Sequence, residues 1–152
     1  MNSVVLTNRT ERLRLADCIL AWVPYLTDGV ETHVLLFLVQ KTLPFGKVGE
    51  YLKLSDLKKG IPGRKIPGLR CFERTTIYKA RKRLCKSGLI TEDRLRESDK
   101  RSLFLINIPA IGAIIRKSDG KMPADIEKAL RKVEDFFNEA GGLPSSVVPL
   151  FN

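Results

Sequence analysis

Apolar residues recur every three or four positions through the N-terminal part of the chain, a spacing that predicts two helices. The first is predicted over 12–23, with Asn8 or Thr10 as its N-cap and Pro24 after its end. The second is predicted over 30–42. Because apolar residues occupy most of its sides, we expect this second helix to be buried.

The middle of the chain changes from a strand pattern to a basic helix. Residues 48–54 predict a short strand, and Ser55 is placed as the N-cap of a short helix over 56–59. Residues 60–70 contain Ile-Pro-Gly twice, and this density of Pro and Gly predicts a loop rather than a helix or a central strand. A helix rich in Lys and Arg is then predicted over 74–87.

The remaining elements are a hairpin and two helices. Residues 89–97 and 102–108 predict extended strands around the turn-prone tetrapeptide 98–101, and helices are predicted over 109–116 and 124–140. A helix pair followed by a β-ribbon is typical of the winged helix-turn-helix plan. We therefore expect an α+β, mostly helical fold, a winged helix-turn-helix with flanking N- and C-terminal helices.

The same pattern divides the chain into three parts. We expect residues 1–29 to form an N-terminal helix packed on the core, and residues 30–108 to form a winged-helix DNA-binding domain. Residues 109–152 are expected to form C-terminal helices and a tail that serve packing, dimerisation or partner docking.

Charge is concentrated in one window of the sequence. The chain carries a net charge of +10, and the stretch 58–86 holds eleven Lys or Arg against one acid, so it accounts for the whole excess. A local basic patch favours an anionic partner, and double-stranded DNA is the partner that we expect.

The sequence offers little for catalysis, metals or membranes. Cys18, Cys71 and Cys85 have no paired spacing, and His33 is the single histidine, so we expect free thiols in a reducing cytoplasm, no metal site and no cofactor. Phosphate-loop, serine-hydrolase and zinc-protease motifs are absent, so we expect no enzyme activity and no catalytic residues. No signal peptide is visible in 1–10, and the longest apolar run is too short to span a bilayer.

The basic helix combines an apolar stripe with a hydrogen-bonding face. The stripe is Ile77, Ala80 and Leu84. Residues near the helix N-terminus are predicted to contact DNA bases: Arg74, Thr75, Thr76, Tyr78 and Lys79. Residues predicted to contact the DNA backbone are Arg64, Lys65 and Arg70 of the loop, Lys82, Arg83 and Lys86 of the helix, and Lys100 and Arg101 of the hairpin tip. The alternatives are a solvated charged helix face and a mobile, solubilising loop.

Two stretches carry a resemblance to a known family. Residues 34–47 read Val-Leu-Leu-Phe-Leu-Val-Gln-Lys-Thr-Leu-Pro-Phe-Gly-Lys, and this segment resembles one in phage origin-binding replication proteins of the O type. Residues 74–78, with Leu84 and 88–90, are similar to the recognition helix common to winged helices. Residues 30–108 thus resemble the winged-helix domain of phage and plasmid replication initiators, which implies that fold and DNA binding.

Three features depart from the family pattern. The loop 60–70 is longer than usual, and Glu73 stands where a Ser or Thr cap is general. Arg81 stands where such helices carry an apolar residue. The long loop bears on the docking angle of the recognition helix. Arg81 implies either an open face or a packed stem whose charged head reaches solvent.

The C-terminal part leaves alternatives open. The helix 124–140 either packs on its own domain or pairs with a second copy in a two-fold homodimer. Its acids are expected to pair along the same helix, Asp125, Glu127 and Glu134 with Lys128, Arg131 and Lys132. The tail 143–152 has a Leu-Phe ending that resembles bacterial sliding-clamp-binding peptides without their usual glutamine. A replication protein is therefore one candidate partner of the tail, and disorder or packing on its own domain is the alternative.

Together these features predict sequence-selective binding of double-stranded DNA at a phage or plasmid replication origin or regulatory site. A winged-helix transcription repressor is one alternative. A module that binds a replisome or host protein in place of DNA is another. We expect the protein to act in the cytoplasm of a bacterial or archaeal host cell, associated with the nucleoid.

Overall fold

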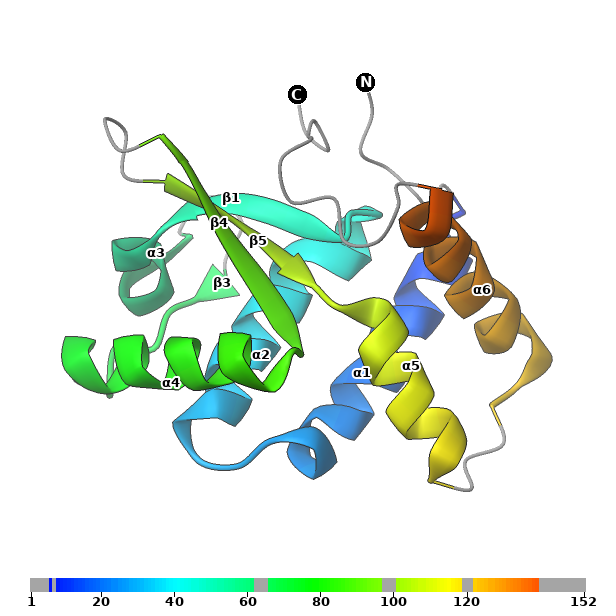
Figure 1. Ribbon diagram of the computed structural model, residues 1–152, viewed down its shortest axis with the longest axis horizontal. Coiled ribbons are helices and arrows are strands. Elements are labelled where there is room, and N and C mark those ends of the chain that lie inside the picture. Colours follow the sequence, from blue (N-terminus) through cyan, green and yellow to red (C-terminus); the bar gives the residue numbers. More distant parts are fainter. Residues whose placement is uncertain (1–5, 7, 62–65, 97–100, 119–121, 140–152) are drawn as a thin grey trace.

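The computed structural model describes residues 6, 8–61, 66–96, 101–118 and 122–139. A three-stranded antiparallel sheet lies against helices, and the helices form most of the molecule (Figure 1). The elements in chain order are α1 (Arg9–Leu26), α2 (Val30–Thr42), the 3-10 helix η1 (Leu43–Phe45), β1 (Gly49–Lys53), α3 (Leu54–Lys59), β2 (Gly60–Ile61), β3 (Ile66–Pro67), α4 (Arg74–Ser87), β4 (Ile90–Arg96), β5 (Arg101–Ile106), α5 (Ile108–Lys117) and α6 (Ala124–Glu139). The expectation of an α+β, mostly helical fold is confirmed.

The sheet has the strand order β1-β5-β4, and both neighbouring pairs are antiparallel. Its central strand, β5, is buried from Ser102 to Ile106. The register places Lys53 of β1 opposite Arg101, at the end of the sheet where β4 ends and β5 begins. Between Asp93 and Arg96 the pairing of β4 with β5 is irregular.

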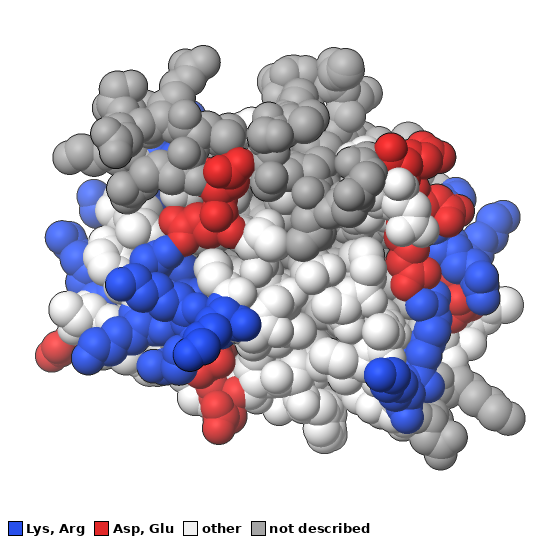
Figure 2. Space-filling model, viewed as in Figure 1, with Lys and Arg blue, Asp and Glu red and all other residues white. Residues whose placement is uncertain are grey.

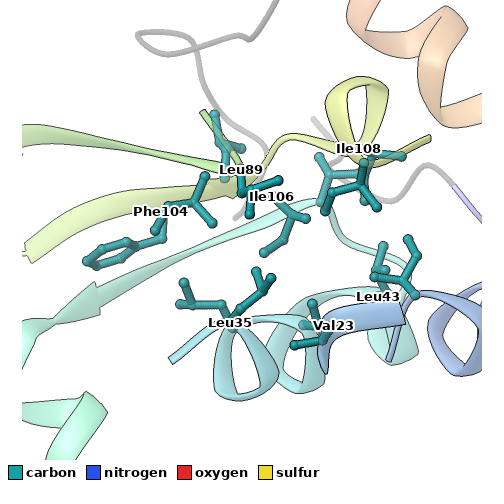
Figure 3. Close-up of a cluster of buried hydrophobic side chains, with 14 of the residues drawn as sticks. Val23, Leu35, Leu43, Leu89, Phe104, Ile106 and Ile108 are labelled. Carbon is teal, nitrogen blue, oxygen red and sulfur yellow. The ribbon is translucent and has the colours of Figure 1, made fainter. Parts of the chain in front are cut away.

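The hydrophobic core lies between the sheet and the helices beneath it. Val23 of α1, Leu35 of α2 and Leu43 of η1 face Phe104 and Ile106 of β5 across the core (Figure 3). Each of these side chains is at most 1% exposed. Because burial of large apolar side chains is the main favourable term in folding, this cluster joins α1, α2 and the sheet into one body.

The last helix packs on its own domain. Its apolar stripe is buried against α1 and α5; the members of the stripe are Ile126, Ala129, Leu130, Val133 and Phe137. Of the two interpretations of this helix, the structure shows the first, and the stripe is not available to a second copy.

Most of the described ion pairs of α6 join it to neighbouring helices. Asp125 pairs with Arg14 of α1, and Glu134 lies 2.6 Å from Arg116 of α5. Lys132 reaches Glu11 of α1 at 2.8 Å. The pair Glu127–Arg131 at 2.9 Å is within the helix as predicted, and the prediction is wrong for Asp125 and Glu134. These acids pair with residues of other helices instead of residues of α6, because packing brings Arg14 and Arg116 beside them.

Three local predictions need correction. Asn8 is the cap of α1, because its Oδ1 accepts from the N–H of Glu11 at 3.1 Å, but α1 continues past Pro24 to Leu26. Ser55 is not the cap of α3, which begins at Leu54 after Lys53; the Asp56 carboxylate accepts from the N–H of Lys53 at 3.0 Å. The Pro- and Gly-rich stretch is not loop throughout, because β2 and β3 form a two-stranded pair.

Candidate nucleic-acid interface

Helix α4 is held on one side and exposed on the other. It packs against α2, α3 and β4, and its stripe of Ile77, Ala80 and Leu84 is fully buried. The predicted bounds of this helix are confirmed. It ends at Gly88, which has a φ of 85°, a left-handed conformation that glycine adopts without steric cost.

The charged side chains on the exposed side of α4 are all basic. At about 100° per residue, the positions 74, 75, 78, 79, 82 and 86 fall within an arc of roughly 140°. Arg74, Thr75, Lys79, Lys82 and Lys86 are exposed. None of these four cations forms an ion pair with any of the residues that the structure describes. Figure 2 shows the resulting group of Lys and Arg side chains over α4, with acids above and below it. We call Arg74, Thr75, Tyr78, Lys79, Lys82 and Lys86 the α4 basic face.

Two predicted base-contacting residues are less exposed than the others. Thr76 and Tyr78 are half-buried, and the ring of Tyr78 packs on the edge of the core. Tyr78 still lies within the arc of the basic face. Thr76 is on the helix side nearer to Ala80 and so lies outside the arc.

The cations on the two flanks of α4 are already paired. The Nε of Arg83 lies 2.7 Å from Oε2 of Glu31 on α2. On the other flank, Arg81 pairs with Glu92 of β4, and both side chains are 13% exposed. Neither expectation for Arg81 holds, because its face is covered by β4 and its charged head ends on Glu92 rather than in solvent. A sequence could not show this pairing, since the two residues lie on different elements.

The long connection between α3 and α4 is fastened at its base. Gly60 pairs with Pro67 and Ile61 with Ile66, so the beginning of the connection and a point seven residues later lie side by side. Gly68 fits there because a Cβ at this position would lie 2.2 Å from the carbonyl oxygen of Lys58. The N–H of Leu69 donates to the carbonyl of Leu57 at 2.9 Å. Residues 68–73 therefore connect this fastened base to α4. The length of the stretch 60–70 does not loosen the attachment of α4.

The described cations of this connection differ in exposure and in their contacts. Lys58 donates through Nζ to the carbonyl of Phe72 at 2.6 Å, so it serves the fold. Arg70 is exposed and donates to the carbonyl of Lys59 at 3.2 Å. Arg64 and Lys65 lie outside the described residues. Lys59 is exposed at the end of α3, and its charge adds to the basic stretch 58–86.

The hairpin of β4 and β5 brings further cations to the same side of the molecule. Its turn end and the N-terminal end of α4 both lie toward the left of Figure 1, with the hairpin end above α4. Arg101 is exposed at this end, opposite Lys53 of β1 and Arg96 of β4 in the register. Lys100 is outside the described residues. The sequence alone does not place Lys53 among these cations, because only the strand register reveals that it lies beside Arg101.

No other chemistry emerges from the described part of the chain. It contains no group of three or more His, Cys, Asp or Glu arranged to hold a metal ion. Cys18, Cys71 and Cys85 are free thiols, and burial raises the pKa of Cys18 and of Cys85. None of the described helices combines the length and the apolar character needed to cross a bilayer.

Comparison of the chain with models of known families, with curated proteins and with solved structures gave no match.

Proposed function

We propose that this protein binds double-stranded DNA sequence-selectively through a winged-helix domain in which α4 is the recognition helix. Its sites would lie in a phage or plasmid replication origin or regulatory region. The observation that carries the proposal is the α4 basic face, which is rigidly backed by the core, exposed, of one charge sign and unpaired among the described residues. A face of this kind suits phosphates and base edges in a groove.

The order and pairing of the elements support the winged-helix part of the proposal. Three helices, α2, α3 and α4, are followed by the β4–β5 hairpin, and β1 pairs with β5 to complete the sheet. In this plan the second helix of the helix-turn-helix enters the major groove and the hairpin lies beside it. The pair Gly60–Pro67 brings the end of α3 next to the segment that leads into α4.

The dimensions of α4 suit the proposed role. Its 14 residues span about 21 Å, enough to cross a major groove about 12 Å wide with both ends near phosphates. Arg74, Thr75 and Tyr78, toward the N-terminus, would approach bases. Lys82 and Lys86 would contact the backbone. Arg83 contributes less than the sequence suggested, because Glu31 already neutralises it.

The choice between origin and promoter rests on the resemblance of residues 34–47 to replication proteins. In the structure these residues form α2 and η1 and the turn after them, and most of them are buried. Their similarity therefore supports the fold of the proposal directly and the replication role only through the family. Location of the bound sites, in iterated origin repeats or in a promoter, separates an initiator from a repressor.

The experiment is selection of bound duplexes from random DNA, followed by titration of the selected site at several salt concentrations. We expect enrichment of one motif, and a plot of log K against log salt with a slope between about −3 and −5 if four or five phosphates are neutralised. The matched control is Lys128→Gln, which removes an exposed cation from α6 and should leave the slope unchanged.

A flat salt response or the absence of any enriched motif would overturn the proposal. If an acidic protein binds the α4 basic face and random DNA fails to compete with it, the protein-interaction alternative replaces DNA binding.

A further inference from the structure

We infer that Arg81 and Glu92 are positioning residues that set the angle between the recognition helix and the β4–β5 hairpin, so that both elements reach the same duplex. The inference rests on the proposed function and deepens it. Neither side chain is placed to touch DNA. Their effect on recognition would pass through the hairpin.

The pair occupies the flank of α4 rather than its exposed arc. Arg81 lies next to the buried stripe, on the side that faces β4. Glu92 lies on β4 directly opposite Phe104 of β5, and Phe104 is 1% exposed in the core. With both charged side chains 13% exposed, the pair is largely shielded from solvent and held by packing on each side.

Among the described side chains, the ion pair between the hairpin and α4 lies two residues beyond the start of β4. The chain connects α4 to β4 through Gly88 and Leu89, at the base of the hairpin. Beyond Ile90, the residues Thr91 to Asp93 are only partly buried, and the strand pairing becomes irregular after Asp93. Over the described residues, Arg81–Glu92 is the one ion pair between α4 and the sheet. It is therefore the contact best placed to restrict rotation of the hairpin about its base.

The polarity of this contact is not explained by stability. Arg81 Nε is buried here without a hydrogen-bond partner in the described part of the chain. A buried ion pair is commonly no more stable than apolar residues of similar volume, whereas loss of one partner leaves an uncompensated charge. An interface that keeps two charges and an unsatisfied polar atom is better suited to defining one geometry than to maximising stability.

The test compares the wild type with a double variant that carries both Arg81→Met and Glu92→Leu. The double variant is preferred because each single variant buries an unpaired charge and risks unfolding. We expect an unfolding midpoint close to that of the wild type and faster hydrogen exchange at the amides of β4 and β5. Affinity for the selected site should fall about tenfold, as for loss of one base contact, and affinity for random DNA should change less than twofold.

Two further variants sharpen the result. Removal of the other flanking pair of α4, Arg83→Gln with Glu31→Gln, is the matched control and should leave hairpin exchange unchanged. The charge swap Arg81→Glu with Glu92→Arg should restore part of the preference for the selected site.

The inference would be overturned if the double variant matched the wild type in both hydrogen exchange and site preference. If the wild type binds no duplex DNA, the proposed function fails. In that case, amide hydrogen exchange of β4 and β5, measured without DNA, still decides whether the pair Arg81–Glu92 fixes the hairpin.

Discussion

Arg83 on α4 donates from its Nε to Oε2 of Glu31 on α2, 2.7 Å away, so a cation beside the proposed DNA-binding face is neutralised by the fold itself. The side chain of Arg83 is 54% exposed, and an exposed pair of this kind contributes at most about 1 kcal/mol to stability. Its larger effect is electrostatic. Glu31 lowers the charge available to phosphates at one edge of the α4 basic face.

This relationship gives the first prediction. Glu31→Gln should release Arg83, add one cation to the interface and steepen the salt slope of DNA binding by about 1. Binding to random DNA should tighten, because the added term is independent of sequence. Titrations of the wild type and the variant at four salt concentrations would measure the change.

The control for this prediction is Arg83→Gln, which should change the slope by much less than Lys82→Gln. Equal losses from the two variants would show that Arg83 leaves Glu31 when DNA binds.

Arg74 and Lys86 lie at opposite ends of the α4 basic face and should behave differently. Arg74→Ala is expected to relax the base preference, at a cost of about 1–3 kcal/mol of discrimination for the contacted base. Lys86→Ala should weaken binding to all sequences alike and reduce the salt slope by about 1. Repeating the selection from random DNA with each variant checks both expectations. An unchanged motif for Arg74→Ala would place base reading elsewhere.

Asn107 joins the end of α4 to the start of α5. Its Nδ2 donates to the carbonyl of Gly88 at 2.7 Å, and its Oδ1 accepts from the N–H of Ala110 at 3.2 Å as the N-cap of α5. Asn107→Ala should lose about 1 kcal/mol for the cap and a further 1–3 kcal/mol or so for the unsatisfied carbonyl. Urea unfolding measures the sum.

Asn107→Asp separates the two terms, because aspartate keeps the acceptor for Ala110 and loses the donor to Gly88. We expect its free energy of unfolding to fall between those of the wild type and Asn107→Ala. A value equal to that of Asn107→Ala would mean that the cap contributes nothing.

Gly68 is expected to tolerate no side chain. A Cβ there would lie 2.2 Å from the carbonyl oxygen of Lys58 and 2.4 Å from the N of Gly60, and both are backbone atoms that cannot turn aside. Gly68→Ala should therefore cost more than about 2 kcal/mol of stability and displace the connection that leads into α4. Gly29→Ala is the comparison, since a Cβ at Gly29 meets nothing and only its φ of 60° opposes the change. Thermal unfolding of the two variants should rank Gly68→Ala as the less stable.

The parts of the fold that were predictable are those that depend on local spacing. The bounds of α2 and α4 were predicted to the residue, because apolar periodicity and a terminal Gly or turn define them without tertiary information. The cations of the basic face were found for the same reason. Spacing along the chain cannot reveal pairs between elements, so the partners of Arg81 and Arg83 were missed, and so was Lys53, whose neighbours follow from strand register.

Acid should loosen α6, for a reason that lies in its ion pairs. A hydrogen bond from Arg116 of α5 lowers the pKa of Glu127, and burial opposes this shift only in part; a hydrogen bond from Arg14 likewise lowers the pKa of Asp125. A carboxyl whose pKa is lower in the folded than in the unfolded chain adds stability above its unfolded pKa, about 4.3 for Glu. That stability is lost as the pH falls through the folded value. We expect the free energy of unfolding to decline as the pH is lowered from about 5 to 3.

Glu127→Gln tests the origin of this decline. The variant cannot gain or lose the proton, so its free energy of unfolding should depend less on pH over the same range, by at most about 1 kcal/mol because solvent screens a pair whose side chains are 34% and 27% exposed. Near pH 3 the two proteins should converge, and at pH 7 the variant should be the less stable. Lys128→Gln on the same helix should keep the slope of the wild type. If Glu127→Gln follows the wild-type curve throughout, the attachment of α6 to α5 does not depend on the charge of Glu127, and the apolar stripe alone holds the helix in place.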